Sequence, residues 1–197
     1  MGLIGIVVCG GESSRMGTDK SQLVYFEKPQ YEHVADLLSG LCNETVISCN
    51  AAQIGRIETE YQKLIDLPQF SNIGPIGALL TAFHTFPEND FLFIGCDYPL
   101  LAKTDISLFY DSIQEDSVAA AFYNKHEKYE PLLSWYSSKT GLDLFRHFKS
   151  GDLSLQSFLR NANADKYIPK DETVMQSVDT PEDSARVTEF LKQKYNG

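Results

Sequence analysis

Short apolar runs alternate along this chain with segments of helical periodicity, and this alternation limits the fold more than any other feature. The run Leu3–Cys9 ends at Gly10-Gly11 and reads as a buried strand that feeds a loop. Phe91–Cys96 (FLFIGC) is the most hydrophobic run and ends at Asp97. Strands that alternate with helices predict a βαβ architecture with a mainly parallel sheet.

The remaining elements follow from the same patterns. The predicted strands are Leu3–Cys9, Glu44–Cys49, Gln62–Ile65, Phe91–Cys96, Ser117–Phe122, Pro131–Tyr136 and Val174–Val178. The predicted helices are Tyr31–Leu41, Gly74–Phe86, Lys139–Phe148, Ser154–Asn161 and Pro181–Lys194. Antiparallel pairing is an option for the strands around Tyr123–Tyr129, a polar connection that we expect to be mobile. No repeat or domain-breaking linker interrupts the chain, so we expect one domain over residues 1–197.

Composition excludes some classes of partner. With 17 Lys and Arg against 27 Asp and Glu, the formal net charge is −10, which argues against nucleic acid and anionic membranes as partners. An anionic ligand would therefore need local cations, a helix N-terminus or a divalent metal. The four cysteines form no CxxC pair, so we interpret them as small buried hydrophobes. Without a signal-peptide pattern or a membrane-length apolar run, a cytoplasmic location is expected.

Polar residues follow the first four predicted strands. They are Gly10-Gly11, Asn50, Asp66 and Asp97. Each is also an ordinary turn residue, so any one of them alone is ambiguous. Ligands of open α/β sheets bind outside the carboxyl ends of the strands, and the convergence of these residues there predicts a binding site.

The stretch Val7–Lys20 (VVCGGESSRMGTDK) has the chemistry of a phosphate-binding loop. Gly10 and Gly11 allow backbone N–H groups to approach a ligand closely, while Arg15 and Lys20 supply local positive charge. The loop is neither a Walker A motif nor a GxGxxG dinucleotide fingerprint. Asp97, before Pro99, is the natural ligand for Mg²⁺ beside phosphate oxygens. The alternatives are a glycine-rich turn with solvated charges and an aspartate that serves only its turn.

The loop also carries a family resemblance. Val8–Lys20 resembles the signature L-A-G-G-x-S-x-R-M-G-x-D-K of the molybdenum cofactor guanylyltransferases, the MobA family. Further matches follow in the family's order. They are Lys28-Pro29, His33-Val34, Asn50, Gly74–Ala78, Asp97-Tyr98-Pro99 and Thr180–Asp183.

The resemblance implies a Rossmann-like three-layer α/β/α sandwich and an enzyme that transfers GMP from GTP to molybdopterin or its molybdenum-loaded form, with release of pyrophosphate. It implies that Val8, Cys9 and Gly10 contact the nucleotide through backbone, that Lys20 binds its phosphates, and that Asn50 and Asp66 lie in the same site. Arg15, Lys20 and Asp97 would be the catalytic residues, with Mg²⁺ on Asp97. Gly11 favours guanine, because related cytidylyltransferases usually read A-A-G-x-S. Other cofactor-biosynthesis proteins and apo-molybdoenzymes are the further partners that it suggests.

Two departures from the family pattern leave questions open. Glu130-Pro131 stands where many members have His-Pro, which puts the contacts to the pterin in doubt. Ser177-Val178-Asp179 replaces N-x-N, so Asp179 is either a second metal ligand or part of the cap before Pro181. The rival functions are a nucleotidyltransferase that uses CTP or another phosphate acceptor, and a non-catalytic protein that binds and delivers the nucleotide or cofactor.

Overall fold

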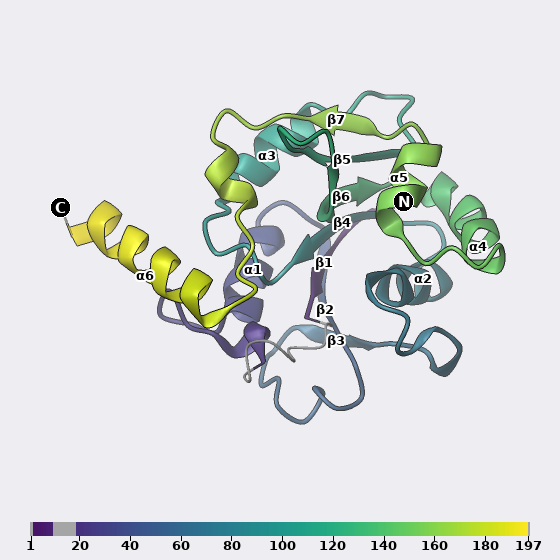
Figure 1. Ribbon diagram of the computed structural model, residues 1–197. Coiled ribbons are helices and arrows are strands. Elements are labelled where there is room, and N and C mark those ends of the chain that lie inside the picture. The colour runs from purple at the N-terminus through teal and green to yellow at the C-terminus, as the bar shows by residue number, and fades with distance from the viewer. Residues whose placement is uncertain (1, 10–18, 197) are drawn as a thin grey trace.

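The computed structural model describes residues 2–9 and 19–196, and a seven-stranded sheet runs through its centre (Figure 1). The strand order is β3-β2-β1-β4-β6-β5-β7. The strands are β1 Leu3–Val8, β2 Glu44–Cys49, β3 Gln62–Ile65, β4 Asp90–Gly95, β5 Ala119–Tyr123, β6 Tyr129–Tyr136 and β7 Asp165–Tyr167. The helices are α1 Gln30–Ser39, α2 Pro75–Thr85, α3 Lys103–Asp111, α4 Gly141–Lys149, α5 Leu155–Asn161 and α6 Pro181–Asn196.

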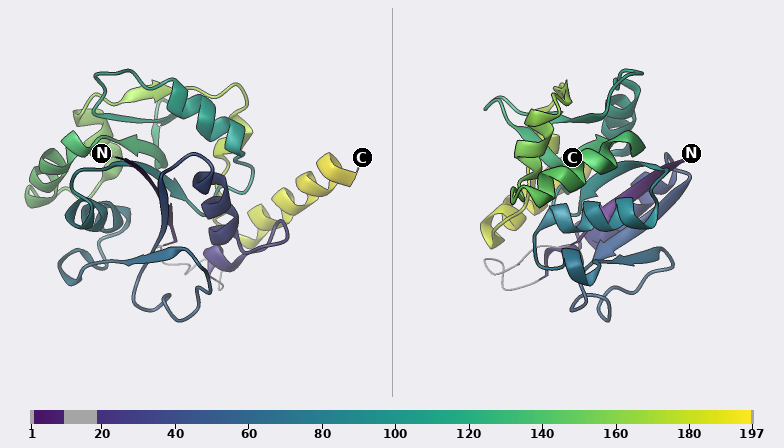
Figure 2. Two further views of the ribbon diagram at one scale, coloured as in Figure 1. Left: turned by 180° about the vertical axis from the view of Figure 1, so that it is seen from behind. Right: turned by 90° about the vertical axis from the view of Figure 1, so that its right-hand side faces the viewer.

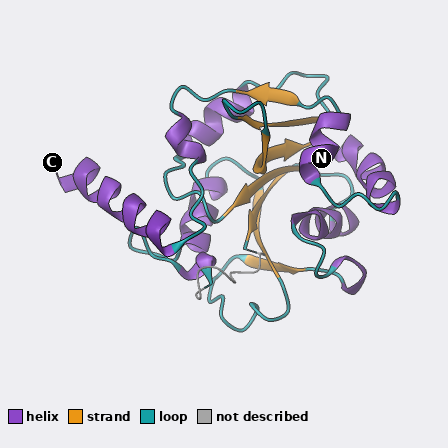
Figure 3. Cartoon of the chain, viewed as in Figure 1, coloured by secondary structure: helices purple, strands orange, loops and turns teal. Residues whose placement is uncertain are grey.

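Helices cover the sheet on both faces, which gives three layers (Figures 1 and 3). α1 and α3 pack on one face, where Leu38 and Phe109 are fully buried. α2, α4 and α5 pack on the other, where Leu79 and Leu159 are fully buried. The expected α/β/α sandwich is thereby confirmed.

The central strands show why both faces need cover. In β1, Val7 faces the α1 side, whereas Ile6 and Val8 face the α2 side. In β4, Ile94 and Phe93 divide between the two faces in the same way. Because side chains alternate along a strand, a strand that is apolar throughout is stable only between two layers.

The sheet is mainly parallel, as predicted. β1 pairs in parallel with both β2 and β4, β2 with β3, and β5 with β7. β6 is antiparallel to β4 and to β5. The strand order reverses direction between β1 and β4, since β2 and β3 lie on one side of this pair and β6, β5 and β7 on the other. In open α/β sheets, ligands bind at such a switch point.

Three sequence-based assignments were wrong or missed. Val174–Val178 is not a strand, because Asp171 caps a 3₁₀ helix over Glu172–Met175 by accepting a bond from the Thr173 amide. The short strand β7 was missed, since its sequence is polar and pairing with β5 forms it. Helix α3 was missed because it buries only Ile106 and Phe109.

The connection between β5 and β6 is shorter than the predicted segment Tyr123–Tyr129. Both tyrosines belong to strands and pair with each other, their ring centroids 5.0 Å apart. Residues 124–128 form a tight hairpin turn, which the Asn124 amide closes by donating to the Lys128 carbonyl over 2.9 Å.

Helix α6 extends away from the sheet (Figures 1 and 2). Its Val187 and Leu191 form a separate small cluster with Val178, against which Leu23 and Leu100 pack. No helix in residues 2–9 and 19–196 has the length and apolar character needed to cross a membrane.

A substitution of Gly77 tests how closely α2 packs against the turn that contains Phe70. A Cβ at position 77 would lie 2.1 Å from the Phe70 carbonyl oxygen, so Gly77→Ala should lower the free energy of unfolding. Alanine gains about 1 kcal/mol of helix propensity, whereas overpacking typically costs about 1–3 kcal/mol and a backbone clash lies at the upper end. Urea denaturation of Gly77→Ala beside Gly55→Ala measures the difference. No described atom lies within 4 Å of a Cβ at Gly55, so equal stability of the two variants would contradict the prediction.

Candidate active site

The carboxyl ends of β1 and β4 lie side by side at the switch point. The register pairs Val8 with Gly95, and the Cys96 amide donates to the Val8 carbonyl over 3.1 Å. Asp97 follows at once, so the sheet delivers its carboxylate to the edge next to the end of β1. The predicted convergence of strand ends on this edge is present for Asn50, Asp66 and Asp97.

Asp97 is partly buried, and its Oδ1 atom has no hydrogen-bond partner among the described residues. This oxygen lies against the backbone, because a Cβ at Gly95 would be only 2.5 Å from it. Burial raises the pKa of Asp97 to about 6, and the charges of Asp179 and Glu130 also raise it, whereas Lys20 lowers it. A desolvated carboxylate oxygen without a donor favours a cation or a proton.

Lys20 faces Asp179 across the site. Its Nζ lies 2.5 Å from Asp179 Oδ1, although the residues are 159 positions apart. This ion pair, supported by the Ser177 hydroxyl, holds the pKa of Asp179 below its ordinary value. The Asp179 side chain is 52% exposed, so the pair adds little stability and its partners can exchange.

The segment before α6 is tied to the same edge. The Val178 amide donates to the Asp97 carbonyl over 2.9 Å. Thr180, not Asp179, caps α6: Thr180 Oγ1 accepts from the Asp183 amide, and Asp183 Oδ2 accepts from the Thr180 amide over 3.0 Å. The carboxylate of Asp179 is therefore directed to Lys20 and Ser177 and not to the helix end.

Asn50 contributes to the site through a turn. Its Oδ1 accepts from the amides of Ala52 and Gln53, a side-chain turn that shapes the loop after β2. Gln53 is buried and donates through Nε2 to the Cys9 carbonyl over 2.9 Å and to Asp19 Oδ2 over 3.0 Å. Gln53 thus joins the ends of β1 and β2 to the segment that carries Lys20.

The other predicted residues have distinct environments. Val8 is buried with its side chain in the core, and the Cys9 amide donates to the Ser48 carbonyl over 3.0 Å. Asp66 Oδ1 is buried without a partner among the described residues, and burial raises the pKa of Asp66 to about 6. The predictions for Gly10, Gly11 and Arg15 fall outside the described residues.

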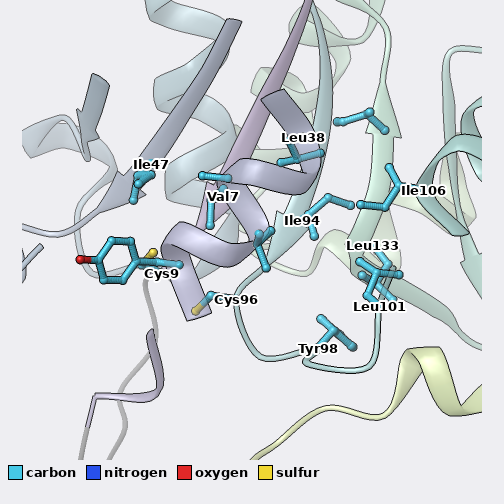
Figure 4. Close-up of a cluster of buried hydrophobic side chains, with 14 of the residues drawn as sticks. Val7, Cys9, Leu38, Ile47, Ile94, Cys96, Tyr98, Leu101, Ile106 and Leu133 are labelled. Carbon is cyan, nitrogen blue, oxygen red and sulfur yellow. The ribbon is translucent and has the colours of Figure 1, made fainter. Parts of the chain in front are cut away.

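The residues that flank Asp97 and the residue that follows β1 belong to a cluster of buried hydrophobic side chains (Figure 4). Cys9, Cys96 and Tyr98 belong to one buried cluster with Val7 and Ile94. Cys9, Cys42, Cys49 and Cys96 are free thiols, and burial raises the pKa of Cys42 to about 12. Contact with Cys96 and burial raise the pKa of Cys9 well above its ordinary value. The cysteines pack within the apolar core or against it, as the sequence indicated.

Glu130 lies on the other side of Asp97, on β6. Its Oε1 accepts from Asn124 Nδ2 over 2.7 Å and its Oε2 from the Tyr98 hydroxyl over 3.4 Å. Burial raises the pKa of Glu130 above its ordinary value.

Sequence reasoning missed Gln53, Asp19 and Asn124 as parts of the site. Asp19 had a local signal, since an aspartate before a polar helical turn is a typical N-cap, and its Oδ1 accepts from the Ser21 amide. Gln53 had no such signal, because its partners Cys9 and Asp19 lie in distant segments of the chain. Asn124 is a typical turn residue, but its contact with Glu130 forms only when β5 and β6 pair as a hairpin.

The described carboxylates suit a single divalent cation whose remaining ligands come from a bound substrate. No group of three or more His, Cys, Asp or Glu in the described ranges could hold a metal ion by itself. Asp97 offers an oxygen without a partner in the described part of the chain, and such a hard oxygen ligand is what Mg²⁺ prefers when phosphates complete its shell. The residues present therefore fit a divalent metal bound beside phosphates.

Comparison with known proteins identifies relatives of this chain. The family described as the MobA-like NTP transferase domain matches residues 5–167. A molybdenum cofactor biosynthesis bifunctional protein from Synechocystis is 26% identical over 94% of this chain, which spans about half (53%) of that protein. A molybdenum cofactor guanylyltransferase from Histophilus somni is 26% identical, with 81% of this chain and 82% of the relative covered.

Solved structures share the fold. Molybdopterin-guanine dinucleotide biosynthesis protein A from Archaeoglobus fulgidus superposes with a TM-score of 0.78 at 21% identity, covering 96% of this chain and 99% of that one. A nucleotidyl transferase from Methanothermobacter has a TM-score of 0.76 at 13% identity, with 98% and 99% covered. At such identities the likeness concerns the fold.

Replacing Asp66 by asparagine should raise the stability of the protein in a pH-dependent way. The pKa of Asp66 rises from 3.8 to about 6 on folding, so burial of the charged carboxylate destabilises the folded state. This destabilisation is absent below pH 3.8 and complete above about pH 6. Asp66→Asn mimics the neutral acid. After allowance for solvent screening we expect a gain of about 1 kcal/mol, or about 2–4 °C in Tm, at neutral pH.

Thermal melts at pH 7.5 and pH 4 measure this effect, with the exposed Asp116→Asn as the control. A gain for Asp66→Asn of the same size at both pH values would show that desolvation of the charge is not its cause.

Proposed function

Because this chain belongs to the MobA-like NTP transferase domain family and is a nucleotidyltransferase, we propose that it transfers GMP from GTP to molybdopterin and releases pyrophosphate. The observation that carries the proposal is the juxtaposition, at the switch point of the sheet, of a lysine and a desolvated carboxylate oxygen that has no hydrogen-bond partner in residues 2–9 and 19–196. Relatives named molybdenum cofactor guanylyltransferase supply the expectation for both substrates.

The proposed reaction is an in-line substitution at phosphorus. A terminal phosphate oxygen of molybdopterin attacks the α-phosphorus of GTP, the bond from this phosphorus to the bridging oxygen breaks, and pyrophosphate leaves. Such a reaction asks the protein for positioning and for neutralisation of charge, and for little covalent chemistry.

The Lys20 ammonium would exchange Asp179 for phosphate oxygens of the nucleotide. In an acidic chain with a net charge of −10, this cation and Arg15 make a triphosphate acceptable. Gly10 and Gly11 would donate backbone N–H groups to the phosphates, and Asn50 and Asp66 would bound the nucleotide on the β2 and β3 side. Asp179, once released from Lys20, is available as a second metal ligand.

Asp97 would hold Mg²⁺ through the oxygen that has no partner among the described residues. The bound metal would supply positive charge beside the phosphates. The burial that raises the pKa of Asp97 to about 6 still leaves it ionised at neutral pH, as a metal ligand must be.

The direct test offers GTP, CTP and UTP separately with molybdopterin and Mg²⁺, and detects pyrophosphate together with the dinucleotide by mass spectrometry. We expect product with GTP. Product formed only with CTP or UTP would replace the guanylyl assignment, and binding of GTP without any product would favour a delivery protein.

Lys20→Ala should lower kcat by roughly 100-fold or more, as loss of a transition-state donor does. The matched control is Lys63→Ala, because Lys63 is a lysine on β3 whose ammonium donates to the Ile54 carbonyl. Steady-state rates of pyrophosphate release compare the two. Turnover of Lys20→Ala within a few-fold of Lys63→Ala would refute the role of Lys20.

Asp97→Ala should abolish the dependence of the rate on Mg²⁺, leaving a low rate that added metal does not restore. A titration of activity against Mg²⁺ concentration measures this, with Asp116→Ala as the exposed control. An unchanged titration curve for Asp97→Ala would assign the residue to its turn alone.

A further inference from the structure

The half of the active edge beyond Asp97 belongs to β6 and β5. Because β6 runs antiparallel to β4 and to β5, its first residues and the last residues of β5 lie at the same edge as the end of β4. The hairpin turn of residues 124–128 therefore lies at this edge (Figure 1). Lys20 and the ends of β1, β2 and β3 occupy the opposite half.

The strand register places Glu130 level with Asp97. β4 and β6 pair Ile94 with Leu133, and the same pairing continued along both strands sets Asp97 opposite Glu130. The contact between Gly95 and Leu132 agrees with this continuation, since a Cβ at Gly95 would lie 3.0 Å from Leu132 Cβ. Glu130 is thus the next carboxylate along the edge, on the side away from the nucleotide residues.

The carboxylate of Glu130 is held in place by two donors. Asn124 Oδ1 accepts from the amides of His126 and Lys128, which directs Asn124 Nδ2 to Glu130 Oε1 at 2.7 Å. The hydroxyl of Tyr98, a residue only 5% exposed, donates to Oε2. An ionised carboxylate has about four acceptor sites, so about two remain for a ligand.

We propose, resting on the proposed function, that Glu130 determines acceptor specificity by binding the N–H edge of the pterin ring. A pterin presents a ring N–H and the 2-amino group side by side, the same pair of parallel donors that a guanidinium offers to a carboxylate. A carboxylate repels phosphate, so the phosphate of the acceptor lies toward Lys20 and the pterin toward Glu130.

The first test is kinetic and uses Glu130→Gln, which preserves shape and removes the charge. Because a hydrogen bond to a charged group is lost, KM for molybdopterin should rise roughly 10-fold or more, while KM for GTP stays within about 3-fold. Glu127→Gln is the matched control, since it removes the same charge from the exposed hairpin turn. A rise in KM for GTP instead would assign Glu130 to the guanine, which has a similar N–H edge. No difference from Glu127→Gln would overturn the proposal.

The second test measures binding directly and needs no turnover. The probes are 6-hydroxymethylpterin and 6-hydroxymethyllumazine, in which a carbonyl replaces the 2-amino group. The wild-type chain should bind the pterin roughly 10-fold more tightly, because the lumazine sets an acceptor against the carboxylate. Glu130→Gln should reduce this preference to within about 3-fold, because its amide can also donate. Equal affinities in the wild-type chain would overturn the proposal even if the variant failed to fold.

The proposed guanylyl transfer and the role of Glu130 can be refuted independently. If the wild-type chain forms no dinucleotide from GTP and molybdopterin, the proposed function is wrong. If it does form the dinucleotide but shows no preference for pterin over lumazine, only the role of Glu130 is wrong.

Discussion

The structure depends on burial of β1 and β4 between two helical layers. Both strands are apolar on both faces, so they are stable only at the centre of a covered parallel sheet. Polar groups can then appear only where these strands end. Asp97 stands at that point with one oxygen that no described group satisfies, and the same desolvation that makes it costly to the fold suits it to a cation.

An attraction between distant parts of the chain completes the site. Lys20 follows the first strand, whereas Asp179 precedes the last helix, and their ion pair joins them across 159 positions. The Val178 amide fastens the same segment to the Asp97 carbonyl. Helix α6 packs mainly on a small cluster outside the sheet, so these polar contacts couple the C-terminal segment to the edge of the sheet. Because the ion pair is exposed and weak, a more highly charged ligand can displace it.

The edge is divided by Asp97 into two chemically different halves. Lys20 supplies positive charge on one side, next to the turn of Asn50 and Gln53. Glu130 lies on the other, held by Asn124 and Tyr98. In the proposed reaction two phosphates would meet near Asp97 with one ring system on each side, an arrangement that agrees with this division of charge. A likeness of fold leaves the acceptor open, since the side chains on β6 and its hairpin decide what binds there.

Local sequence determined the strands, most helices and the residues at the strand ends, because burial on both faces and turn chemistry are written in short patterns. It placed Asn50, Asp66 and Asp97 after apolar runs, where the strands do end, whereas the roles of these residues and of Lys20 in binding stay predictions. It failed where long-range contacts decide: β7 exists through pairing with β5, and Val174 packs from a 3₁₀ helix instead of a strand. The partners Lys20–Asp179, Gln53–Asp19 and Glu130–Tyr98 were set by tertiary structure alone, since hydrogen bonds between distant elements leave no periodic signal in the sequence.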